Sequence, residues 1–193
     1  MTDSNLIIII VAFVVAVIAI YILYSIILYQ GGGGNKGDEL QLSTKNILEQ
    51  VEVLFDKQEY SLVQLLATKY LDRVPGHIEV RIYLAKAYYE DKKYNQAIKQ
   101  CAIILKKKSN SIETRQLLGN CYIKKHMPTK AIKEFEAVFE SKKNDKLVVR
   151  TLAELYKETD QLFSAITMYE VLSGLMDLDE DVADIQSILA ELN

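Results

Sequence analysis

The chain repeats one pattern of large, small and aromatic residues with a constant period of about 34 residues over its carboxyl-terminal two-thirds. Leu84, Ala85 and Tyr88 set the pattern, and residues 118–122 and 152–156 repeat it without an insertion. A period of this length is typical of stacked supersecondary units, because one such unit cannot bury its apolar face alone. We therefore expect an array of similar units, in which each unit is stabilised by its neighbours.

Each unit is expected to be a pair of short antiparallel helices. From Thr44 onward, apolar residues recur at helical spacing and polar clusters separate them, whereas no stretch alternates as a strand does. Small residues recur at Ala85, Gly119 and Ala153, and alanines recur at Ala97, Ala131 and Ala165. These two small sets would let the paired helices approach closely. The sequence therefore predicts an all-α fold.

The pattern resembles the tetratricopeptide repeat (TPR) family. This resemblance implies a solenoid of helical hairpins over about two-thirds of the chain. The first block is divergent, because Gln50 and Val51 stand where the large and small residues should be. The blocks are 44–77, 78–111, 112–145 and 146–179.

Residues 180–193 are expected to form a final helix. Ile185, Ile188 and Leu189 share one face of it, and acidic residues occupy the rest. Such a helix covers the exposed surface of a last repeat. The alternative is a docking helix that leaves the stack to bind a partner or another copy.

The amino-terminal part contains an apolar run, Leu6–Tyr29, without a charged side chain. As a helix it would be about 36 Å long, which is enough to cross a bilayer core of about 30 Å. The tail of residues 1–5 carries Asp3 and no Lys or Arg, unlike a secretory signal peptide. We therefore predict a single transmembrane helix that anchors the chain in the lipid bilayer.

The orientation of this helix follows from the cations beside it. Lys36 and Lys45 lie on its carboxyl side, whereas the short tail has only its α-amino group. This bias favours a cytoplasmic repeat domain, and the alternative is an exported repeat domain. Ala12 and Ala16 form a small-xxx-small pair that could join two helices into a homo-oligomer, although a plain anchor needs no such pair.

Residues 30–43 are expected to be a flexible linker. Four consecutive glycines, residues 31–34, provide no side chains to bury and have maximal backbone freedom. No strand followed by Lys-Ser or Lys-Thr accompanies them, so the motif of a phosphate-binding loop is missing. The linker would hold the repeats near the membrane surface.

The sequence does not predict an enzyme. His77 and His126 fall in different turns without a carboxylate or thiol at metal-ligand spacing, and both are expected to be surface residues. Cys101 and Cys121 are expected to be small buried apolar residues. No catalytic triad or cofactor motif is present in a context that would make it chemical. We expect no metal and no cofactor.

The charge pattern does not favour nucleic acid as a partner. Lysine clusters such as Lys106–Lys108 are balanced by acids, and the formal net charge is −3. Cations near helix carboxyl termini complement the helix dipole, which explains most of them. Contact with anionic lipid headgroups is the alternative use of these lysines.

The resemblance to TPR proteins also implies a binding site. In that family, the first helix of each pair lines a concave groove that binds a segment or helix of a protein partner. The chain would then be a membrane-anchored scaffold or adaptor, and the alternative is a self-associating structural organiser of a membrane complex. The residues in phase with such a groove are Glu79, Ile82, Lys86, Tyr89, Glu113, Gln116, Asn120, Ile123, Arg150, Glu154 and Lys157.

Overall fold

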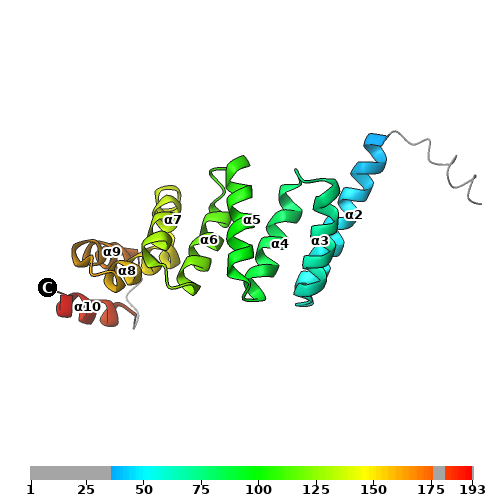
Figure 1. The fold of residues 1–193 in the computed structure, drawn as a ribbon. Coiled ribbons are helices and arrows are strands. Elements are labelled where there is room, and N and C mark those ends of the chain that lie inside the picture. The colour runs from blue at the N-terminus through cyan, green and yellow to red at the C-terminus, as the bar shows by residue number, and fades with distance from the viewer. Residues whose placement is uncertain (1–35, 176–180, 193) are drawn as a thin grey trace, which may run out of the picture. The chain divides into compact units, whose positions relative to one another are not determined.

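The computed structural model describes residues 36–175 and 181–192, and every regular element in these ranges is an α-helix (Figure 1). The prediction of an all-α helical repeat fold is confirmed. The helices are α2 (Lys36–Asp56), α3 (Tyr60–Arg73), α4 (Ile78–Glu90), α5 (Tyr94–Lys107), α6 (Ile112–Lys124), α7 (Pro128–Ser141), α8 (Lys146–Glu158), α9 (Leu162–Leu175) and α10 (Asp181–Leu192).

The chain divides into two units, residues 1–46 and 47–193, and the boundary falls within α2. In the first unit the helix already begins at Lys36, so the predicted linker needs correction for residues 36–43. Glu39 and Gln41 are good helix formers, and extending an existing helix requires no new nucleation. The predicted tail, the Leu6–Tyr29 run and residues 30–35 lie outside the described residues. Among the helices that are described, none has the length and apolar character to cross a membrane.

The helices of the second unit repeat with the period of the sequence. The first helices of successive pairs, α4, α6 and α8, begin at equal intervals along the chain, at Ile78, Ile112 and Lys146. The second helices keep the same interval, since α3 and α5 begin at Tyr60 and Tyr94. The uninterrupted period therefore produces helices of nearly constant length.

Small residues allow the two helices of each pair to pack closely. Ala85, Ala97 and Ala131 are fully buried. Gly119 of α6 lies against Phe135 of α7 so closely that a β-carbon at residue 119 would be 2.6 Å from Cε2 of the ring. The aromatic ring of α7 thus occupies space that only glycine leaves open.

The turn inside each pair contains a residue in the left-handed conformation. Gln58, Lys92, His126 and Asp160 all have positive φ, between 53° and 61°, and none of them is glycine. After α4, the N–H of Lys92 donates to Tyr89 O at 2.9 Å, and the next N–H donates to Tyr88 O at 2.8 Å. These two bonds form a Schellman motif, which satisfies carbonyls at the helix end and reverses the chain.

The next pair begins at a capped helix. The side chains of His77, Ser111 and Asp145 accept hydrogen bonds from the first-turn N–H groups of α4, α6 and α8. His77 is therefore a partly buried capping residue that packs edge-on against Tyr70 at 5.6 Å, which corrects the expectation of a surface turn residue.

The apolar core is divided among neighbouring pairs. One cluster joins Val51, Val63 and Ala67 of the first pair to Leu84 and Ala87 of α4. Two further clusters continue this arrangement along the stack. Each pair therefore buries its apolar surface against the first helix of the next pair.

The two ends of the stack are covered differently. Leu84, Leu118 and Leu152 are buried, whereas Gln50 at the equivalent position of α2 is exposed and Val53 is 45% exposed. A polar outer face of this kind is expected of a terminal repeat. At the other end α10 packs on α9, with Ile185 buried in the last core cluster.

Candidate partner-binding surface

The candidate surface consists of residues at matching positions on three first helices. Glu79, Glu113 and Leu147 have one register, and the remaining candidates follow at helical spacing from it. The predicted residues lie as Glu79, Ile82, Lys86 and Tyr89 on α4, as Glu113, Gln116, Asn120 and Ile123 on α6, and as Arg150, Glu154 and Lys157 on α8.

Three apolar members of this set are used for packing. Ile82 and Ile123 are half-buried against core clusters. Tyr89 is half-buried, and its ring lies 5.7 Å from that of Tyr94 on α5. Burial raises the pKa of the Tyr89 hydroxyl. These side chains therefore support the stack and offer little area to a partner.

Two charged members of the set contact each other. Lys86 Nζ lies 2.5 Å from Glu113 Oε1, so an ion pair joins α4 to α6. The same ammonium lies 5.6 Å from the centre of the Tyr83 ring. A partner that binds either charge has to compete with these contacts.

Glu79 also has a partner within the chain. Its Oε1 accepts a hydrogen bond from Lys108 Nζ at 3.0 Å, and Lys108 lies directly after α5. A backbone hydrogen bond, followed by that from Lys108, lowers the pKa of the Glu79 carboxyl. This carboxylate thus links α4 to the end of α5, and a partner that binds it has to compete with Lys108.

The most accessible part of the surface is on α8. Glu154 and Lys157 are exposed, and Arg150 is exposed as well. Leu147 in the first turn is 70% exposed although it was not among the predicted residues. The repeat would have identified it, because it stands one full period after Glu113. Gln116 and Asn120 of α6 are half-buried.

Sequence reasoning also missed a repeated arginine contact. Arg81 donates from Nη1 to Gln100 Oε1 at 2.7 Å and from Nη2 to Pro75 O at 2.8 Å. One period later, Arg115 donates to Glu134 Oε2 at 2.8 Å and to the backbone carbonyl of Ser109. Each arginine therefore links its own helix to the second helix of the pair and to the preceding loop.

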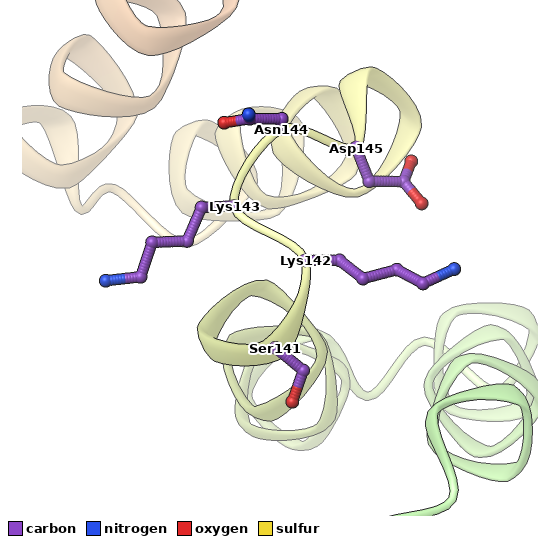
Figure 2. Close-up of a pocket in the computed structure, with 5 residues that line it drawn as sticks. All are labelled: Ser141, Lys142, Lys143, Asn144 and Asp145. Atoms are coloured by element: carbon purple, nitrogen blue, oxygen red, sulfur yellow. The ribbon is translucent and has the colours of Figure 1, made fainter.

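The described residues contain shallow depressions elsewhere, and their lining side chains do not form a cluster directed at one point. One lies at the loop from Ser141 to Asp145, where the side chains of Lys142 and Lys143 point in opposite directions (Figure 2). The Asp145 carboxylate there caps α8 by accepting from Leu147 N–H and Val148 N–H. Another lies beside the turn between α2 and α3. None of the predicted groove residues lines either one.

The two cysteines are buried and form no disulfide. Cys101 and Cys121 have no exposed surface. Burial raises the pKa of both thiols, that of Cys121 to about 12. Within the described ranges, no group of three His, Cys, Asp or Glu residues is arranged to hold a metal ion.

Comparison with known proteins gives a likeness in fold. No protein-family model and no curated protein matches the chain. The chain shares the fold of MamA. A solved structure of MamA AMB-1 superposes with a TM-score of 0.68 at 15% identity, covering 78% of this chain and 82% of that chain. MamA MSR-1 gives a TM-score of 0.62 at 16% identity, covering 77% of this chain and 83% of that chain. MamA is a TPR-like helical repeat protein.

Proposed function

We propose that this chain is a membrane-anchored scaffold that binds a protein partner through the candidate surface. The observation that carries the proposal is the placement of accessible charged and apolar side chains, Leu147, Glu154 and Lys157, on one first helix of the stack. The TPR-like fold shared with MamA supports a scaffold role.

The proposed partner is a polypeptide segment that meets both signs of charge. On α8 an apolar anchor, Leu147, is followed along the helix by an anion and a cation. A few anchors surrounded by complementary polar contacts suffice for specific binding. Lys86 and Glu113 would contribute after their ion pair opens, so we assign the first contact to α8.

The proposed anchor is the Leu6–Tyr29 run predicted from the sequence. Its length and lack of charge support a single pass through the bilayer. The lysines on its carboxyl side support a cytoplasmic repeat domain. A scaffold fixed in this way would gather its partner at the membrane surface.

The test is crosslinking of the tagged full-length protein in its native membrane. A variant with Leu147→Ala, Glu154→Lys and Lys157→Glu changes only exposed side chains of α8. The control variant Lys130→Glu with Lys133→Glu changes exposed lysines of α7, a second helix. Circular dichroism would establish that both variants fold.

Partners that crosslink to the parent and control proteins, and are lost from the α8 variant, are the expected result. Retention of every partner by the folded α8 variant would overturn the assignment of the surface. Crosslinks between copies alone would replace the adaptor with the self-associating structural organiser.

A further inference from the structure

The helices α3 and α5 carry an excess of positive charge that the rest of the chain does not share. Together they contain five cations and one acid, Asp72, although the formal net charge of the chain is −3. The second helices of the later pairs, α7 and α9, contain two cations and four acids. The five cations, all exposed, are Lys69, Arg73, Lys99, Lys106 and Lys107.

None of these five cations forms an ion pair with another residue in the described part of the chain. By contrast, Lys86, Lys93 and Lys108 are each paired with a carboxylate. The charge of α3 and α5 is therefore available to an external anion.

Large apolar side chains are exposed among these cations. Leu62 and Leu65 of α3 are 46% and 67% exposed, and Ile103 of α5 is 37% exposed. On α7 the positions equivalent to the two leucines are lysines, Lys130 and Lys133. At these two positions, an exposed leucine is thus a property of α3 and not of the repeat.

The apolar and basic residues share one side of each helix. Leu62, Leu65 and Lys69 follow each other at helical spacing, and so do Lys99, Ile103 and Lys106. Lys99 and Ile103 also stand one full period after Leu65 and Lys69, so both groups have the same register in consecutive pairs. We name these six residues the α3/α5 face.

We propose that the α3/α5 face binds the surface of an anionic lipid bilayer. Leucine and isoleucine side chains would enter the boundary between headgroups and acyl chains, while the lysines contact the anionic headgroups. Nucleic acid would use the cations alone, so the exposed leucines favour lipid. The proposal does not depend on whether Leu6–Tyr29 spans the bilayer.

Fluorescence provides a direct test, because the chain has no tryptophan. The variant Leu65→Trp, made in the full-length protein, would be mixed with vesicles that contain brominated phosphatidylcholine, with or without phosphatidylserine. The expected result is a blue shift and quenching that require phosphatidylserine and weaken with added salt. The variant Phe163→Trp is the positional control, because Phe163 of α9 is 85% exposed and lies on a helix without cations.

The charge dependence has a matched control. Adding Lys69→Glu and Lys99→Glu to Leu65→Trp should abolish the part of the quenching that requires phosphatidylserine, since one cation near an anionic surface strengthens binding about fivefold. Adding Lys130→Glu and Lys133→Glu should leave it unchanged. Lys133 stands at the position of Lys99 one repeat later, and each variant replaces two exposed lysines by glutamate.

Absence of quenching at residue 65 in both kinds of vesicle would overturn the proposal, and so would equal quenching with and without phosphatidylserine. Binding of an acidic protein or a nucleic acid that protects residue 65 without lipid quenching would reassign the face. Flotation with vesicles of phosphatidylcholine alone separately tests the anchor, because the apolar run needs no anionic lipid. Failure of one proposal therefore does not imply failure of the other.

Discussion

Arg115 donates a hydrogen bond from Nη1 to Oε2 of Glu134 at 2.8 Å, which joins α6 to α7 by a partly buried ion pair. One repeat earlier the same positions are Arg81 and Gln100, where the guanidinium donates to a neutral amide oxygen in place of a carboxylate. One repeat later the positions are taken by Val149, which is fully buried, and by Met168. The same place in the stack thus accepts either a polar bridge or apolar packing.

Replacement of Arg115 by valine should destabilise the stack. The change leaves the Glu134 carboxylate without its partner at a site where that side chain is 13% exposed. We expect a loss of about 1.5–3 kcal/mol in the free energy of unfolding, because the lost bond involves charged groups. Urea denaturation followed by circular dichroism would measure it.

The double variant Arg115→Val with Glu134→Met should recover most of this loss. It introduces the residue pair of the next repeat, and apolar replacement of both partners of a buried pair is often neutral. If the two single losses simply add in the double variant, Arg115 and Glu134 are not coupled and the interpretation is wrong.

Gly119→Ala should destabilise the protein although alanine is the better helix former. Its β-carbon would lie 2.6 Å from Phe135 Cε2 and 2.9 Å from Cδ2, so the ring has to move. We expect overpacking of about 1–3 kcal/mol to exceed a propensity gain of about 1 kcal/mol. Thermal and urea unfolding would show the difference.

The matched background for this change is Phe135→Leu. The smaller side chain leaves room, so adding Gly119→Ala to it should cost less than in the parent protein. An equal cost in both backgrounds would place the clash elsewhere.

Lys92→Gly should stabilise the turn between α4 and α5. Lys92 has φ of 58°, where a β-carbon is strained and glycine is not. Compared with Lys92→Ala, we expect the glycine variant to be more stable by about 1 kcal/mol. Differential scanning calorimetry of the two variants is the measurement, and a more stable alanine variant would contradict it.

The stability of the fold should decrease at alkaline pH partly because of Cys121. Burial raises the pKa of its thiol to about 12 in the folded protein. An unfolded cysteine has a pKa of about 8.5, so the unfolded state loses this proton first as the pH rises. The contribution of the thiol is therefore complete below the unfolded pKa and is lost progressively toward the folded pKa.

Cys121→Ala tests this pH dependence. Alanine already occupies the equivalent position as Ala87, which is fully buried. Denaturation between about pH 7 and about pH 10 should show a smaller loss of stability in the variant than in the parent. Identical pH profiles would exclude a contribution of this thiol.

Much of the fold could be predicted from the sequence, because its period is uninterrupted from Leu84 to Tyr169. The start of α2 could not be predicted, since the glycines before Lys36 gave no indication of where the chain becomes helical. Gln50 did not match the pattern because the pattern describes contacts with a preceding repeat. In α2 that face is the outer end of the stack, where a polar residue is suitable.

The sequence predicted which residues share the register of the candidate surface, but it did not predict which of their side chains are exposed. Helical phase placed Tyr89 and Ile123 beside Lys86 and Asn120, but phase does not show which neighbours cover a side chain. The contact of Tyr89 with Tyr94 comes from another helix. Pair contacts such as that of Lys86 with Glu113 likewise depend on how two repeats are stacked.

The polar outer face of α2, which contains Gln50, restricts how such an array can lengthen during evolution. A duplicate of the first helical pair placed anywhere inside the stack would bring Gln50 to a position where Leu84, Leu118 and Leu152 are buried. Burying an amide there without a hydrogen-bond partner costs roughly 1–3 kcal/mol. New repeats are therefore tolerated most readily as copies of the inner pairs, because an inner pair already has an apolar surface toward the pair before it and another toward the pair after it.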